Sequence, residues 1–191
     1  LILLPMVLIV MQRETGSALV YLAFFFMLYR EGMPGSILFA GVCAVVYFVV
    51  GIKFGQDLTP DGCTPMGEFI VFTLVTLWSA SLVYAYCEKK DAVWKILLYH
   101  GGSILLALLF SIYVIPFNLV YFLYLECLGL VVYLLYLSLH ERVMHYFYIA
   151  LFAIGSVGFL YSADYVFQDI LEPHQRIRIE VLLGMEEDLA G

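Results

Sequence analysis

Apolar residues fill seven long stretches of this chain, and short polar segments separate them. A helix that spans the hydrocarbon core of a bilayer needs about 20 apolar residues. The runs are continuous and do not alternate with polar positions, so they predict helices and not strands. The predicted spans are 1–11, 17–29, 36–54, 67–86, 93–115, 117–139 and 143–163. The pattern therefore predicts an all-α, polytopic bundle of about seven membrane helices.

Composition supports a membrane protein. Of the 191 residues, 64% are hydrophobic and only 13% are charged, whereas about a quarter of the residues in a soluble domain are charged. The net charge of −7 argues against a nucleic-acid partner, because phosphate binding needs a basic surface. Membrane lipids are the partners that the composition implies.

Basic residues predict the orientation, because Lys and Arg near helix ends are held on the cytoplasmic side. One set of helix ends carries Arg30, Lys89, Lys90, Lys95 and Arg142. The opposite set carries only Arg13 and Lys53 before the tail. The segments predicted to lie inside are therefore 29–35, 87–91 and 140–142. The segments predicted to lie outside are 12–16, 55–66 and everything from residue 164 onward.

The segment 55–66 is dense in Pro, Gly and Asp, which favours turns. Asp57 and Asp61 suggest calcium ligands, but the other ligand positions of a calcium loop are missing, so a solvated turn is favoured. Cys43, Cys87 and Cys127 lie in or at the end of apolar runs and are interpreted as packing residues, whereas Cys63 lies in the loop. No metal site is predicted.

Three polar groups are candidates for chemistry. In the first, Gln12-Arg-Glu-Thr-Gly-Ser17, Ser17 or Thr15 could cap the second helix with Glu14 complementing its positive end. The same charges could instead line a polar cavity at the outer boundary. Spacing alone leaves both interpretations open.

The second group consists of His100 and Glu126, which fall near the middles of their apolar runs. A charge at mid-bilayer costs about 3 kcal/mol, so each should face protein or be neutral. A proton or ion pathway is one interpretation. A protonated Glu126 that hydrogen-bonds to a neighbouring helix is the favoured one, because no second acid lies nearby in sequence.

The third group lies in the tail, where His174, Gln175, Arg176 and Arg178 alternate with aliphatic residues. Docking of an amphipathic segment on the membrane surface would produce this pattern. Two arginines beside a bilayer also suit a diphosphate headgroup, because guanidinium groups bind phosphate oxygens in a bidentate way. Composition does not separate these interpretations.

At two of these places the chain resembles the RodA and FtsW group of bacterial membrane proteins, the shape, elongation, division and sporulation family. Residues 12–17 resemble that family's Gln-Pro-Asp-Leu-Gly-Thr, with Arg13, Glu14 and Thr15 in place of Pro, Asp and Leu. Residues 174–191 resemble the run Tyr-Gln-x-x-Arg that opens its large extracytoplasmic loop, with Gly184-Met185 in place of Asp-Pro. Between the two motifs this chain has four more predicted helices than the family, within about 36–139. The His-Gln-x-x-Arg-Ile run favours the elongation branch.

The resemblance implies a peptidoglycan glycosyltransferase of the bacterial plasma membrane that polymerises a lipid-linked disaccharide-pentapeptide precursor, with a class B penicillin-binding transpeptidase as partner. A lipid-precursor flippase of the same family and an unrelated ion-coupled transporter remain alternatives. The resemblance carries over Gln12, Glu14 and Gly16 as cavity residues and the polar residues of the tail as headgroup candidates. The family's proposed catalytic Asp lies in a His-Thr-Asp run further along the loop, so no residue here is nominated as catalytic.

The expected organisation is a transmembrane region over 1–163 and the start of an extracytoplasmic loop over 164–191. Both ends are interpreted as cut, so we expect the chain to be an internal fragment that is inactive alone. No cofactor is identifiable in it, and a divalent cation enters only through the family resemblance.

Overall fold

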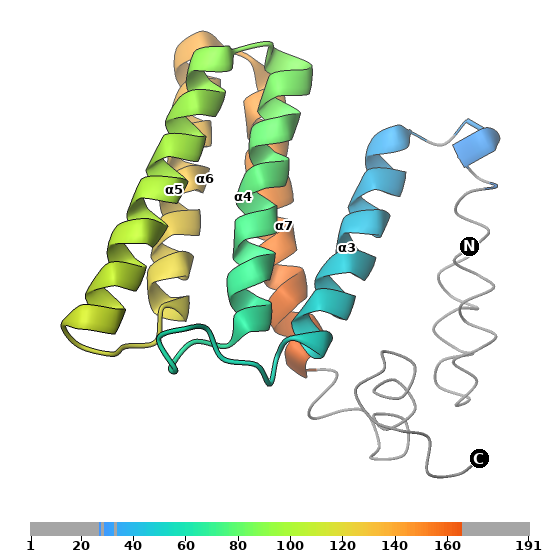
Figure 1. The fold of residues 1–191 in the computed structure, drawn as a ribbon. Helices are drawn as coiled ribbons and strands as arrows, with labels where there is room; N and C mark the ends of the chain where they lie inside the picture. Colours follow the sequence, from blue (N-terminus) through green and yellow to red (C-terminus); the bar gives the residue numbers. More distant parts are fainter. Residues whose placement is uncertain (1–26, 28, 33, 166–191) are drawn as a thin grey trace, which may run out of the picture.

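The computed structural model describes residues 27, 29–32 and 34–165 of the chain (Figure 1). Five long helices account for most of this part: α3 (Gly35–Lys53), α4 (Met66–Cys87), α5 (Lys90–Tyr113), α6 (Val120–Glu141) and α7 (Met144–Tyr165). Each contains a window that is long and apolar enough to cross a membrane. The only β pairing among the described residues is an isolated bridge between Leu58 and Pro65. The protein is thus an all-helical bundle compatible with a multi-pass membrane protein.

The helical class expected from the sequence is confirmed, and the described residues contain five apolar helices, whereas seven were predicted for the whole chain. The predicted span 1–11, and all of 17–29 except Met27 and Tyr29, lie outside the described residues. Each of the other five predicted spans corresponds to one observed helix. The predicted extracytoplasmic segment from Val166 to the end of the chain also lies outside the described part.

Two helix boundaries differ from the prediction by three residues. Helix α5 begins at Lys90 rather than at residue 93. Its first turn carries charged residues that an apolar count leaves out, and Asp91 complements the positive end of the helix. Helix α6 begins at Val120 rather than at residue 117. Pro116 favours an extended residue before it, and the Asn118 side chain accepts a 2.9 Å hydrogen bond from the Val120 N–H.

Helices α4 and α7 form the centre of the bundle. Helix α7 packs extensively on both α4 and α6, whereas α3 packs on α4 and α7 from one side. Helix α5 packs on α4 and makes few contacts with α6 (Figure 1). The largest fully buried side chains include Tyr47, Leu123, Leu134 and Tyr146. The weak contact between α5 and α6 leaves room for polar groups between these two helices.

Helices α3 and α4 approach closely near the loop that joins them. The Gly67 N–H donates a 2.8 Å hydrogen bond to the Phe54 carbonyl. A Cβ atom added to Gly67 would lie 2.7 Å from the Gly51 carbonyl oxygen, and one added to Gly55 would lie 2.6 Å from the same oxygen. Any side chain at these two positions would collide with backbone. Glycine is therefore required for this crossing.

The two ends of the bundle differ in charge. One end, here called the basic end, holds the start of α3 and the short connections that carry Lys89 and Arg142 (Figure 1). There Lys89 Nζ lies 3.2 Å from Glu141 Oε1 and joins the two connections. The opposite end, here called the loop end, holds the connections 54–65 and 114–119 and the end of α7 (Figure 1). The predicted inside and outside segments within 29–165 are thus separated onto opposite ends.

Candidate functional site

The site residues predicted from the sequence motifs fall outside the described part of the chain. They are Gln12, Glu14, Gly16, His174, Gln175, Arg176 and Arg178. The remaining candidates, His100 and Glu126, lie within it. The structure brings these two together.

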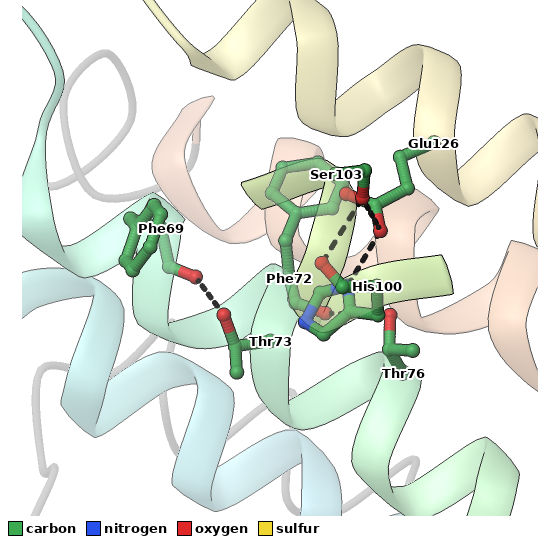
Figure 2. A network of polar contacts seen from close by, with 7 residues as sticks. All are labelled: Phe69, Phe72, Thr73, Thr76, His100, Ser103 and Glu126. Carbon is green, nitrogen blue, oxygen red and sulfur yellow. Dashed lines mark hydrogen bonds and ion pairs between the residues drawn. The ribbon is translucent and has the colours of Figure 1, made fainter. Parts of the chain in front are cut away.

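His100 on α5 and Glu126 on α6 form a buried pair (Figure 2). The distance from His100 Nδ1 to Glu126 Oε1 is 2.7 Å, and the two residues are 6% and 4% exposed. Ser103 Oγ lies 2.9 Å from the same Glu126 oxygen and 3.0 Å from the His100 carbonyl oxygen. Glu126 is therefore held by two side chains of the neighbouring helix.

Helical periodicity explains why these polar residues face inward. On α6, Glu126 belongs to a row of buried residues at spacings of three and four, with Leu123 before it and Leu130 after it. On α5, His100 follows the buried Ile96 by four positions, and Ser103 follows His100 by three. Both pair members thus occupy core positions of otherwise apolar helix faces. The expectation that each would face protein is confirmed.

The pair retains hydrogen-bonding capacity that the described residues do not use. His100 Nε2 and Glu126 Oε2 are buried, and no described group lies within hydrogen-bonding distance of either atom. The nearby Thr76 hydroxyl donates instead to the Phe72 carbonyl at 3.2 Å (Figure 2). A buried polar atom without a partner costs about 1–3 kcal/mol. The pair therefore has two buried polar atoms that a water or a small polar group would satisfy.

Low polarity around the pair favours its electrically neutral states, because an uncompensated charge is costly there. Three arrangements are neutral: an imidazolium with a carboxylate, an imidazole protonated at Nε2 with a carboxyl group protonated at Oε1, and an imidazole protonated at Nδ1 with a carboxyl group protonated at Oε2. In the first two, His100 Nε2 carries a hydrogen and Glu126 Oε2 is an acceptor, and in the third these roles are exchanged. The pair therefore presents one unused donor and one unused acceptor.

A pocket of about 320 Å³ adjoins the pair. Helix α4 contributes Thr76, and the other lining residues come from α5 and α6: Lys95, Ile96, Tyr99, His100, Glu126, Gly129, Leu130 and Tyr133. Tyr99 crosses toward α6, where its hydroxyl lies 3.6 Å from the position of a Cβ atom at Gly129. The pocket thus occupies the space where α5 and α6 are not in close contact.

The pairing of His100 with Glu126 was not predicted. Counting outward from the connection 114–119 places Tyr133, and not Glu126, opposite His100 on the following antiparallel helix. In the structure His100 meets Glu126 instead, on two helices that make few contacts with each other. The mostly apolar sequence of both helices hides this register, so only the hydrogen bond of Glu126 to a neighbouring helix was expected, and it is confirmed.

A second polar cluster lies at the loop end and centres on Asp61. Its carboxylate accepts hydrogen bonds from the Thr59 hydroxyl, from the Thr64 hydroxyl at 2.8 Å and from the Ser111 hydroxyl at 3.2 Å. Thr64 Oγ1 also accepts a 2.9 Å bond from the Leu119 N–H. The segment 55–66 was expected to be a solvated turn. It does turn, but Thr59 and Thr64 are buried, because these bonds fasten it to α5 and to the start of α6.

These contacts affect the charge of Asp61. Partial desolvation raises the pKa of its carboxyl group, but the hydrogen bonds from Thr59, Thr64, the Cys63 N–H and Ser111 outweigh it, so the net pKa is lowered. Asp61 therefore acts as an ionised acceptor that organises the loop end.

The cysteines mostly match their interpretation as packing residues. Cys43 and Cys127 are buried, Cys87 is half-buried and Cys63 is exposed, and all four are free thiols.

Comparison with known proteins adds no relative: no family model, curated protein or solved structure matches this chain.

Proposed function

We propose that this chain is part of a glycan polymerase of the bacterial plasma membrane, related to the RodA and FtsW group and working in cell elongation. Its substrate would be the lipid-linked disaccharide-pentapeptide precursor, and its partner a class B penicillin-binding transpeptidase. The observation that carries the proposal is the pair of motifs at 12–17 and 174–191, each with several residues in the order that the family uses.

The arrangement of the helices supports the proposal. The two motifs must lie on the same side of the membrane to serve one extracytoplasmic site. Five helices separate the start of α3 from the end of α7, which lie at opposite ends of the bundle. The predicted span 17–29 would add one more crossing. Six crossings between the motifs return the chain to its starting side, as the proposal requires.

The proposal gives the motif residues distinct tasks. Glu14, with Gln12 and Gly16, would line an outward-facing cavity, where a carboxylate positions a basic group or the polar head of the substrate. Arg176 and Arg178 would bind the diphosphate through charge-assisted hydrogen bonds, with His174 and Gln175 beside them. No general base is assigned to this chain.

The arginines provide the sharpest test of substrate binding. Replacing Arg176 and Arg178 together with Gln in the full-length protein should raise the apparent KM for the lipid-linked precursor, because each charge-assisted contact is worth about 1.5–3 kcal/mol. Lys replacements should restore only part of the affinity, since an ammonium group lacks the bidentate geometry. An unchanged KM, with loss of membrane association of the tail, would make the arginines membrane anchors.

A flippase of the same family would use the same cavity without forming glycosidic bonds. Purified full-length protein with its transpeptidase partner should therefore be given labelled precursor, and both glycan polymer and headgroup translocation should be measured. Polymer formation supports the polymerase. Translocation without polymer would replace it with the flippase.

One observation favours a second candidate, an ion-coupled membrane transporter: the buried His100–Glu126 pair beside a pocket. Ionisable residues within membrane helices often mark ion or proton pathways. Glu126→Gln should then abolish proton-linked transport in proteoliposomes. Polymer synthesis that continues in the same variant would assign the pair a task separate from glycan chemistry.

A further inference from the structure

We propose that the His100–Glu126 pair is a proton-binding site that exchanges protons with water at the basic end of the bundle, through the pocket between α4, α5 and α6. The inference rests on the pocket and on the two unpartnered buried atoms. It rests on the second candidate function in that it concerns the same pair, whereas it does not depend on the glycan polymerase.

The lining residues show the direction of access. On α5, Lys95, Ile96 and Tyr99 all precede His100, and α5 begins at the basic end. On α6, the lining residues Gly129, Leu130 and Tyr133 follow Glu126, and α6 also ends at the basic end. The pocket therefore extends from the pair toward the basic end. At a rise of about 1.5 Å per residue, the exposed Lys95 lies roughly 7.5 Å closer to that end than His100.

On its other side the pair is closed by apolar side chains. Ala107 is buried one turn beyond Ser103 on α5. Leu123 and Val120 are buried on α6, in the turns that precede Glu126. The polar contacts of Ser111 and Asp61 begin only beyond this layer. The pocket thus lies on the side of the pair that faces the basic end, and these buried apolar residues lie on the side that faces the loop end.

The pocket can hold the water that proton exchange needs. Its volume of about 320 Å³ is well above the roughly 10–15 Å³ of space that the centre of one water needs. A water beside the pair can accept from the Nε2–H of His100 and donate to Glu126 Oε2, which uses both unpartnered atoms. The site thus matches the donor and acceptor pattern of water itself.

The proposed exchange starts from the neutral arrangements in which one proton lies between His100 Nδ1 and Glu126 Oε1 and another is on His100 Nε2. Loss of the Nε2 proton to a pocket water leaves a carboxylate that accepts from Nδ1–H, with Nε2 as a free acceptor and a net charge of −1 on the pair. Uptake from a hydronium ion in the pocket reverses this step.

The surrounding charged and titratable groups favour exchange with the pocket. Lys95 and Tyr99 face the pocket from α5, and Tyr133 from α6, where Cys127 is the neighbour of Glu126. Helix α4 contributes the uncharged Thr76. Lys95 is the cation among the lining residues, and its positive charge near the mouth offsets the negative charge of the deprotonated pair.

Infrared spectroscopy of the purified protein tests proton binding. The difference spectrum between acidic and alkaline pH should contain a carboxyl signal that is lost in Glu126→Gln and retained in Asp91→Asn, which changes an exposed carboxylate in the first turn of α5. His100→Gln should move the pH at which the signal appears. A difference spectrum that is identical in wild type and Glu126→Gln would overturn the proposal.

Cysteine labelling tests the route and does not need a change at the pair. Gly129→Cys lines the pocket and has space, because its nearest neighbour would be the Tyr99 hydroxyl at 3.6 Å. Leu128→Cys is the matched control, since Leu128 is exposed on the outside of the same turn. Both variants are made in a Cys63→Ser background and treated in vesicles with a small cationic thiol reagent. The reagent should modify Gly129→Cys about tenfold faster than Leu128→Cys, because thiolate forms in water and not in lipid. This should occur only when the reagent is on the side of the basic end. Equal rates, or labelling from the loop end alone, would contradict the route.

Discussion

At the scale of single residues, the described part of the bundle contains a buried polar pair whose members stabilise each other across two helices. Glu126 Oε1 is hydrogen-bonded both to His100 Nδ1 and to the Ser103 hydroxyl. Neither helix face shows any other charged residue at this depth, since the remaining buried residues of α6 are aliphatic or cysteine. The pair therefore joins α5 to α6 where apolar contact between them is sparse.

Removing the carboxyl group should loosen that connection. Glu126→Ala leaves His100 Nδ1 without its partner and the Ser103 hydroxyl with only the His100 carbonyl oxygen, so we expect a loss of about 1–3 kcal/mol. Glu126→Gln should cost less, because the amide oxygen still accepts. Thermal unfolding in detergent measures both, with Leu128→Ala on the lipid-facing side as control. Equal melting temperatures for Glu126→Ala and the control would show that the pair does not stabilise the bundle.

Asp61 should make the stability of the loop end depend on pH. Its lowered pKa means that the ionised form is favoured by folding. This stabilisation is complete above the ordinary Asp value of about 4 and is lost as the pH falls through the lower folded value. Asp61→Asn should thus be less stable than wild type at neutral pH, and the gap should narrow in acid.

Unfolding measured across that pH range, with Ser111→Ala as a variant that removes one of the contacts, checks the prediction for Asp61. Ser111→Ala should reproduce part of the effect. A gap between wild type and Asp61→Asn that stays constant down to the most acidic sample would refute the account of the loop.

At the scale of elements, the helices were predictable and their pairing was not. Continuous apolar runs fix helices in lipid, because every backbone group must be satisfied within the segment, and the five spans within 35–165 were located to within a few residues. The boundaries at Lys90 and Val120 depended on charged first turns and on Asn118, which hydropathy ignores. The contact of His100 with Glu126 depended on register, which uniformly apolar faces do not encode.

The crossing of α3 and α4 is an element contact that one methyl group should disturb. Gly67→Ala places a Cβ atom 2.7 Å from the Gly51 carbonyl oxygen, and overpacking of this kind typically costs about 1–3 kcal/mol. Gly41→Ala is the control, because nothing lies within 4 Å of its Cβ position, and alanine in a helix is more stable than glycine by about 1 kcal/mol. Thermal unfolding should therefore move in opposite directions in the two variants. A Gly67→Ala protein as stable as Gly41→Ala would contradict the observed crossing.

At the scale of the whole molecule, the described part of the bundle separates its charges along the direction of its helices. Lys89 and Arg142 lie in the connections at the basic end, whereas the loop end carries the Asp61 cluster and the exposed Cys63. Positive charge near helix ends is retained in the cytoplasm. The basic end should therefore face the cytoplasm, which would place the pocket mouth inside the cell and the loop end outside.

The native Cys63 provides a probe of this orientation. A membrane-impermeant thiol reagent should label it in intact cells whose outer barrier is opened, because the side chain is exposed in the loop. In a Cys63→Ser background, a cysteine at Lys90 should be labelled only after the membrane is permeabilised. Labelling at Lys90 but not at Cys63 in intact cells would invert the orientation and move the proposed proton route to the outer side.

The central claim is that this membrane bundle belongs to a glycan polymerase whose cavity includes Glu14, and polymer synthesis tests it most directly. The full-length protein, purified with its transpeptidase partner, should convert labelled lipid-linked precursor into glycan chains. Glu14→Ala should reduce that synthesis strongly, because the basic group that the carboxylate is proposed to position would lose its partner, and breaking a buried ion pair typically costs about 3–5 kcal/mol. Glu14→Asp should be milder, and Asp91→Ala, a control at an exposed carboxylate, should resemble wild type. Full synthesis by Glu14→Ala at normal protein levels would reduce Glu14 to a helix cap, and absence of polymer from the wild-type protein would contradict the proposed function.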